Sequence, residues 1–359
     1  MYASTVDVRR VPVGGGAMVG ATALPRLTLD GETMRRALPH SLLPACLAAL
    51  ALVAGLAGPA QAADPPLTVP QARLAASFHC PQPIVKGGAQ PIMVVTGTGY
   101  TGAQAYEIGK VVLSGFGRPV CYVDFPYMTT GDVQIAAEYL VNGIRRMYAK
   151  GGQRIAMLGV SQGGLLMRWA LTYWPSLRTK VTDAVSIAGT QHGTNLIKKG
   201  ACSPAAPCTP ATWQQAAGSN LLTALNRQPD ESPGPTDWTT VRSATDETVQ
   251  PQTGKHPTSA LRGATNILIQ DICPGRVVGH IPSALDSVTY EALVDAFTHK
   301  GPAKVSRFAK DVCAHPMAPG ATPVERAAGV RAAGPDVQVE APKVGREPKV
   351  RAYALKRVK

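Results

Sequence analysis

The amino-acid sequence predicts an α/β fold: a doubly wound, mostly parallel sheet with helices on both faces. Short apolar runs alternate with amphipathic stretches of helical length from about residue 91 to 187. This alternation is typical of strand–helix–strand units. The 359 residues are 45% hydrophobic and only 16% charged, which excludes a disordered chain. They suffice for one large domain with appendages or for two ordinary domains.

The predicted elements follow one another in a regular order until about residue 190. Strands are expected at residues 91–96, 119–124, 154–159 and 181–187, and helices at about 103–114, 133–148 and 165–173. Residues 190–235 interrupt this order, because they are rich in Gly, Pro, Ser, Thr and Ala, with an amphipathic stretch at 213–225. We expect them to form a small cap over the carboxyl edge of the sheet. Two more strands are expected at 238–243 and 265–270.

The two ends of the chain differ from this core. Arg35 and Arg36 precede an apolar run at 47–56 and the small residues Ala60 and Ala62, which is the pattern of a cleaved signal peptide. The run is too short for a good membrane span. A lipoprotein anchor at Cys46 is also disfavoured, because the main apolar run follows this cysteine rather than preceding it. We therefore expect four parts: an upstream extension (1–33), a signal peptide (34–62), the α/β domain (63–316) and a basic, loosely ordered tail (317–359).

The formal net charge of +13 raises the question of nucleic-acid binding. The excess is spread over the chain: residues 1–62 carry +2, residues 322–359 carry +5 and the remainder +6. No zinc-finger spacing or aromatic RNA-binding motif accompanies it, so we do not expect a nucleic-acid partner. The tail is expected to be solvated, with affinity for acidic surfaces.

Six cysteines follow the predicted cleavage site, and an even number in an exported chain predicts disulfides. They are Cys80, Cys121, Cys202, Cys208, Cys273 and Cys313. Six cysteines allow 15 pairings, and spacing alone does not choose among them. No CxxC pair or histidine cluster lies nearby, so a metal site is not expected.

A G-x-S-x-G sequence at residues 159–163 centres on Ser161. Five residues alone are weak evidence, but this pentapeptide ends an apolar strand and opens a predicted helix. That is the setting of a nucleophile elbow, in which the serine sits on a strained turn. The alternative is a serine in an ordinary glycine turn.

A nucleophilic serine needs a base and an acid that orients the base, and on this kind of sheet they follow in the order Ser, acid, His. Asp246 and His280 each come after a predicted strand, where the rim of the site is expected. Glu247 is the main competitor for the acid. The other histidines that follow Ser161 fit less well, and we expect surface or hydrogen-bonding roles for them: His192, His256, His299 and His315.

The oxyanion of an acyl-transfer reaction needs donors. We expect one from the backbone N–H of Gln162 and one from the turn after the first strand, where the Thr98 hydroxyl could add a third. The same turn, residues 97–102, also matches G-x-G-x-x-G, with Asp124 at the end of the next strand, as in nicotinamide-dependent oxidoreductases. Export counts against that alternative, and it leaves the elbow, Asp246 and His280 unexplained.

Several separated segments, taken together, resemble a known family. They are Val95–Gly99 with Thr101 and Gly102, Ser161–Gly164 with Trp169, Trp213–Gln215, and Ser243–Glu247 with Val249–Gln252. In this order they resemble the Candida antarctica lipase B-like branch of the α/β-hydrolase lipases, here as a bacterial-type relative, over about residues 80–313. The resemblance implies an α/β-hydrolase fold and a catalytic domain at 63–316.

The resemblance also implies roles for residues. Ser161 would be the nucleophile, Asp246 the acid and His280 the base, with Thr98 and Gln162 in the oxyanion hole. It suggests the disulfides Cys80–Cys121 and Cys273–Cys313; Cys202 and Cys208 have no counterpart, so we expect them to pair with each other, in a loop over the pocket mouth.

Substrate-binding positions would be Val160, Gln215, Thr248 and Ile281. Where this chain has Val160, the family's yeast member has a Trp. It has a branched residue in place of Thr248 and a small residue in place of Ile281. Its Asp after the fourth strand is replaced around Thr190–His192. The preferred ester is therefore left open.

Together these observations predict a secreted serine ester hydrolase without cofactor or metal, extracellular or periplasmic and monomeric. The first choice is a triacylglycerol lipase acting on lipid or ester substrates, also at an oil–water interface. The alternative is a carboxylesterase or polyester hydrolase with the same residues. An exported lipid-binding protein with a dead site is a third possibility.

Overall fold

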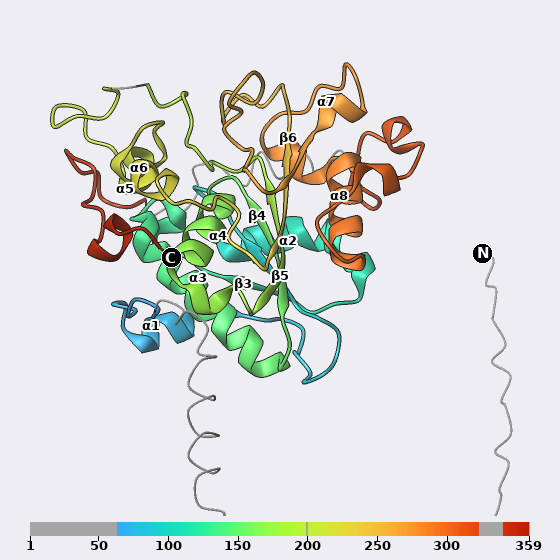
Figure 1. Ribbon diagram of the computed structural model, residues 1–359, viewed down its shortest axis with the longest axis horizontal. Helices are drawn as coiled ribbons and strands as arrows, with labels where there is room; N and C mark the ends of the chain where they lie inside the picture. The colour runs from blue at the N-terminus through green and yellow to red at the C-terminus, as the bar shows by residue number, and fades with distance from the viewer. Residues whose placement is uncertain (1–62, 199, 323–339, 359) are drawn as a thin grey trace, which may run out of the picture. The chain divides into compact units, whose positions relative to one another are not determined.

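The computed structural model describes residues 63–198, 200–322 and 340–358 (Figure 1). The expected upstream extension and signal peptide, residues 1–62, lie outside the described residues, and so do residues 323–339 and 359 of the expected tail. None of the helices in the described ranges is long and apolar enough to cross a membrane.

A seven-stranded sheet forms the centre of the domain. The strands are β1 (Phe78–His79), β2 (Ile92–Val95), β3 (Val120–Val123), β4 (Ile155–Val160), β5 (Val181–Ile187), β6 (Asp237–Arg242) and β7 (Thr265–Leu268). Their spatial order is β1-β3-β2-β4-β5-β6-β7, and only β1, at the edge, runs antiparallel to its neighbour. The predicted mostly parallel α/β sheet is confirmed. The two-residue β1 was not predicted, because so short a strand has no pattern of its own.

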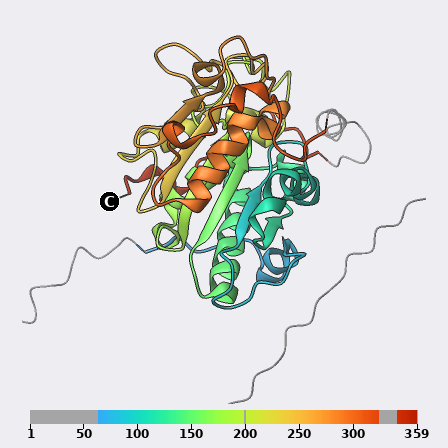
Figure 2. The same cartoon turned by 90° about the vertical axis from the view of Figure 1, so that its right-hand side faces the viewer.

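Helices cover both faces of the sheet. They are α1 (Gln71–Ala76), α2 (Gly102–Leu113), α3 (Val133–Gly151), α4 (Gln162–Tyr173), α5 (Pro210–Gln215), α6 (Asn220–Asn226), α7 (Ile269–Ile272) and α8 (Ser287–Thr298). Short 3-10 helices lie at Ser114–Phe116, Pro126–Thr129, Pro175–Leu177, Ile281–Leu285, Val305–Arg307, Val312–Ala314 and Ala352–Leu355. Figure 2 shows α8 lying across one face.

The strand β2 shows why predicted strands of this sheet can be continuous runs of apolar residues. Met93 and Val95 belong to the core on the side of α3 and α4, and Ile92 and Val94 to the core on the side of α2 and α8. All four are buried. Strands buried on both faces have apolar residues at every position rather than at alternate ones.

Helix ends are set by local hydrogen bonds. Thr101 and Gln104 form a reciprocal capping box at the start of α2, and the Asp132 side chain accepts from the backbone N–H of Gln134 at the start of α3. Within the amphipathic stretch at 213–225, Gly218 has φ +80°. α5 ends before it, at Gln215, since Ala216 is extended with φ −62° and ψ 134°. The stretch therefore contains the end of α5 and all but the last residue of α6, with a turn at 216–219 between them.

Three disulfides join the pairs Cys80–Cys121, Cys202–Cys208 and Cys273–Cys313. These are the pairs that the resemblance and the leftover cysteines suggested. The first and third each connect residues about 40 positions apart, so they hold together distant parts of the chain.

The expectation of a loosely ordered tail is wrong for residues 340–358, which we call the C-terminal segment. Tyr353 packs against Trp169, Tyr173 and Trp174, and Ala354 is fully buried. The segment, red in Figure 1, lies beside α5 and α6. A few apolar residues interspersed among the basic ones are enough to dock it, and a composition averaged over the tail hides them.

Polar contacts complete the docking of this segment. The carboxylate of Glu347 accepts hydrogen bonds from the first two backbone N–H groups of α6, at 2.8 and 2.9 Å, where a negative charge is favourable. Arg351 pairs with the buried Glu138 of α3 at 3.0 Å. The C-terminal segment therefore connects α6 with α3.

Candidate active site

Ser161 lies at the sharp turn between β4 and α4. Its backbone has φ 56° and ψ −123°, a combination that costs a non-glycine residue of the order of 1–3 kcal/mol. A Cβ on Gly163 would lie 2.2 Å from the carbonyl oxygen of Val95, so only glycine lets the helix start this close to β2. The predicted G-x-S-x-G turn thus has the geometry of a nucleophile elbow.

Neighbouring strands bring the two predicted oxyanion elements together. Val95 of β2 is paired in register with Gly159 of β4, so the turns after both strands emerge side by side at the carboxyl edge. A Cβ on Gly97 would lie 3.0 Å from the Cβ of Ser161. Thr98 is therefore a close neighbour of the elbow.

Asp246 and His280 form a buried pair. Asp246 follows β6, and its Oδ2 lies 2.8 Å from Nδ1 of His280; their side chains are 0% and 5% exposed. The other carboxylate oxygen, Oδ1, accepts hydrogen bonds from the backbone N–H groups of Thr248 and Val249, each at 2.8 Å. These donors satisfy the buried carboxylate and hold it toward the imidazole.

The ring of His280 is held through its backbone as well. Its N–H donates to the carboxylate of Glu247 at 3.0 Å, and its carbonyl accepts from the Ser283 hydroxyl at 2.6 Å. Glu247, the competitor for the acid, thus contacts the backbone of the histidine, whereas Asp246 contacts the ring.

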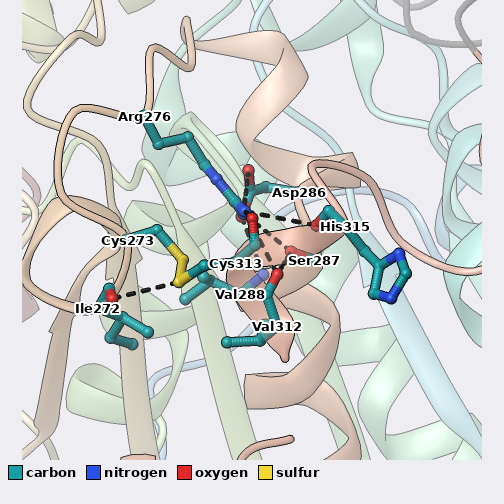
Figure 3. Close-up of a disulfide and its surroundings, with 9 residues drawn as sticks. All are labelled: Ile272, Cys273, Arg276, Asp286, Ser287, Val288, Val312, Cys313 and His315. Carbon is teal, nitrogen blue, oxygen red and sulfur yellow. Dashed lines mark hydrogen bonds and ion pairs between the residues drawn. A yellow bond between two sulfur atoms is a disulfide. The ribbon is translucent and has the colours of Figure 1, made fainter. Parts of the chain in front are cut away.

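The loop that carries His280 is anchored to α8 and to the chain beyond it (Figure 3). The disulfide Cys273–Cys313 holds its start. The guanidinium of Arg276 lies 3.1 Å from Asp286, the N-cap of α8, and donates to the Cys313 carbonyl at 2.8 Å. Both side chains of this ion pair are largely buried, so the loop is fixed on both sides of His280.

Ser161 and His280 line one cavity of about 410 Å³. Most of its wall is apolar; the apolar side chains include Ile108, Val112, Leu158, Ile187, Leu196 and Val249. The four expected substrate-binding positions, Val160, Gln215, Thr248 and Ile281, are all in the wall. An apolar cavity beside a strained serine and a buried Asp–His pair suits the acyl chain of an ester.

The cap contributes to this cavity only in part. Residues 190, 194, 196 and 197 and residues 212 and 215 lie in the wall, whereas none of residues 202–208 does. Cys208 instead pairs with Val344 of the C-terminal segment. The Cys202–Cys208 loop therefore lies against that segment rather than at the pocket mouth, where we expected it.

The other predicted candidates have other partners. Nδ1 of His192 lies 3.0 Å from the Thr258 carbonyl, and its Nε2 is 3.7 Å from Glu231, in a second cavity. Burial raises the pKa of Glu231, but hydrogen bonds from His192 and from the Arg262 backbone outweigh it and lower that pKa to about 2. His299 and His315 are each beside an Asp four residues earlier, and His256 is exposed.

Asp124, the candidate ribose ligand of the oxidoreductase alternative, is also engaged. It accepts from the N–H of Gly102 at 2.8 Å and lies 3.2 Å from His79. The glycine-rich turn itself contributes Gly97 and Thr98 to the cavity of Ser161. The turn therefore belongs to the site around Ser161, whereas Asp124 holds the start of α2.

Sequence reasoning assigned no role to Gln252. Its amide group lies 3.4 Å from Asp246 and donates to Ser259 at 2.8 Å. The signal was present, since Gln252 closes one of the segments that carried the family resemblance. The sequence analysis also missed the hydrogen bonds that join Gln215 to Thr98 and Gln162.

This fold is that of the α/β-hydrolases. No protein-family model matches the sequence. The chain is 33% identical to lipase B of Pseudozyma antarctica over 321 residues, 87% of this chain and 92% of that protein. The chain therefore belongs to the lipase B family, and the resemblance read from the sequence is confirmed.

Solved structures agree with this placement. The crystal structure of Aspergillus fumigatus lipase B superposes with a TM-score of 0.74 at 31% identity, covering 81% of this chain and 73% of that one. A Bacillus licheniformis lipase in its propeptide form has a TM-score of 0.50 at 16% identity over 63% of this chain and 54% of that one. At this identity the second match shows the fold alone. Membership of the lipase B family makes the chain a lipase or related carboxylic ester hydrolase.

Proposed function

We propose that the protein is a triacylglycerol lipase that works through Ser161, His280 and Asp246. The observation that carries this proposal is that the strained Ser161 and the buried Asp246–His280 pair meet at one apolar cavity. The named relatives are lipases, which supports a glyceride ester as the substrate.

In the proposed reaction, Nε2 of His280 takes the proton of the Ser161 hydroxyl as the oxygen attacks the ester carbonyl. Asp246 orients the ring through Nδ1 and stabilises the imidazolium. The backbone N–H groups of Thr98 and Gln162 stabilise the oxyanion. His280 then protonates the leaving alcohol, and water releases the fatty acid from the acyl-enzyme in a second round.

Action at an oil–water interface belongs to the same proposal. Leu196 lines the cavity and is 59% exposed, and Val277, three residues before His280, is 74% exposed. Exposed apolar side chains near a cavity can contact a lipid surface. Three disulfides fit an extracellular protein, and we propose export through residues 34–62 and a monomeric state in solution.

Labelling with a fluorophosphonate probe tests the serine. The wild-type protein should bind the probe covalently, and Ser161→Ala should neither bind it nor hydrolyse p-nitrophenyl esters. Unlabelled, inactive but folded wild-type protein would contradict the proposal and favour a lipid-binding protein with a dead site.

A chain-length series then separates the lipase from the carboxylesterase or polyester hydrolase. A lipase should gain activity on emulsified long-chain glycerides above their solubility limit. Preference for short soluble esters, without such a gain, would assign the chain to the second class.

A further inference from the structure

The hydroxyl of Thr98 takes part in a buried network of side-chain amides. It donates to Oε1 of Gln162 at 2.5 Å and accepts from Nε2 of Gln215 at 3.0 Å. The same Nε2 lies 3.1 Å from Oε1 of Gln162, and the hydroxyl of Thr190 donates to Oε1 of Gln215 at 3.1 Å. Both glutamine side chains are at most 5% exposed.

The direction of these hydrogen bonds is set by a backbone carbonyl. Nε2 of Gln215 also lies 3.3 Å from the carbonyl oxygen of Ala211, which can only accept, so the NH₂ end of Gln215 must face Thr98 and Gln162. Gln162 must then present its oxygen to that NH₂ group. The hydroxyl hydrogen of Thr98 consequently points to Gln162.

This direction has a consequence for the oxyanion hole. The Thr98 hydroxyl can reach a developing oxyanion only if it gives up its hydrogen bond to Gln162. Oε1 of Gln162 would then be a buried carbonyl oxygen, which is costly without a donor. Nε2 of Gln215 remains within hydrogen-bond distance of that oxygen and so supplies the donor.

We propose that Gln215 is a positioning residue that lets the Thr98 hydroxyl switch from Gln162 to the oxyanion. One N–H of its NH₂ group is held by the Ala211 carbonyl, and the other is shared between Oγ1 of Thr98 and Oε1 of Gln162. This shared N–H makes the Thr98 hydroxyl a stronger donor before the switch and keeps Gln162 paired after it. Gln215 acts through Thr98 and does not touch the oxyanion. The inference rests on the proposed hydrolase function and deepens it.

A double-mutant cycle in turnover of a p-nitrophenyl ester tests this. Thr98→Val should lower kcat about 10²-fold. Gln215→Met and Gln215→Glu keep the length of the side chain but remove the donor, and each should lower kcat about tenfold in the wild-type background, with KM changed less than about threefold. In the Thr98→Val background neither should lower kcat by more than about twofold, because the hydroxyl through which Gln215 acts is gone.

A neighbouring glutamine of the same helix provides the matched control. Gln214 is also buried in α5, but its amide bonds to Asp132 and to the N–H of Val133. Gln214→Met should therefore leave kcat within about twofold even if it lowers the melting temperature.

The outcomes are distinct. Equal losses from the Gln215 variants in both backgrounds, a loss confined to KM, or an unchanged rate in Thr98→Val would each overturn the inference while leaving a hydrolase that depends on Ser161. A wild-type protein without esterase activity would overturn the proposed function and the inference together.

Discussion

Replacing Asp246 with asparagine exchanges one carboxylate oxygen for an NH₂ group, and the surroundings decide which one. Oδ1 accepts two backbone N–H groups at 2.8 Å, and these donors cannot rotate away. The amide oxygen must therefore take the Oδ1 position. Its NH₂ group then faces Nδ1 of His280, at the position of the 2.8 Å contact.

The effect on the base follows from this orientation. A donor facing Nδ1 requires that nitrogen to be unprotonated, so the ring proton moves to Nε2, the atom that must accept the Ser161 proton. We expect kcat of Asp246→Asn to fall roughly 10⁴-fold, the size seen for such a wrong tautomer. This equals about 5.4 kcal/mol of transition-state stabilisation.

Hydrolysis of p-nitrophenyl butyrate, followed together with the melting temperature, measures this loss on folded protein. The matched control is Glu247→Gln, whose amide oxygen can still accept from the His280 backbone N–H, and it should lose less than about tenfold. If Asp246→Asn keeps more than a tenth of the activity, or Glu247→Gln is the more damaging change, the acid is not Asp246.

Three further predictions concern stability. Cys273→Ser/Cys313→Ser opens a disulfide with a sequence separation of 40 and should lower the free energy of unfolding by about 4 kcal/mol; an unchanged urea midpoint would contradict this. Burial, with the neighbouring Asp237, raises the pKa of Asp183 from 3.8 to about 6, so the folded state binds a proton that the unfolded state releases. The free energy of unfolding should therefore fall as the pH rises from about 4 to 6. Asp183→Asn should remove this fall and raise the free energy of unfolding by up to about 3 kcal/mol at pH 7. Parallel pH profiles of the two proteins would refute this prediction. Tyr353→Ala should cost about 2–3 kcal/mol in a denaturant titration, and no cost would mean that the C-terminal segment docks without stabilising the domain.

The fold could be predicted from the sequence where burial produces a local pattern of apolar residues. The strand β5 has the predicted bounds, 181–187. The strand β2 lies within the predicted 91–96, because a strand covered on both faces has apolar residues at every position, and all four of its residues are apolar and buried. Ser161, Asp246 and His280 could be proposed because parallel strands bring the residues after their carboxyl ends to one edge of the sheet. Chain order and strand ends were sufficient for that.

Features that depend on particular side-chain contacts could not be read in this way. Gln215 is 117 residues from Thr98 and 53 from Gln162, and nothing local to any of the three reveals their hydrogen bonds. The C-terminal segment was misjudged for the same reason, since its docking depends on Tyr353 reaching an aromatic group 184 residues earlier in the sequence. Long-range contacts made by a few side chains leave little trace in composition.

The docking of the C-terminal segment also bears on the order in which the protein can fold. The ring of Tyr353 is part of the packing around Trp169 and Trp174, and Arg351 pairs with Glu138 in the second turn of α3. These partners precede the segment by 184 residues (Trp169 to Tyr353) and 213 residues (Glu138 to Arg351), so during synthesis they must wait for it before their contacts can form. Until then the aromatic surface of α4 stays open, so nascent chains should depend on a chaperone, or on rapid completion of synthesis, to avoid aggregation.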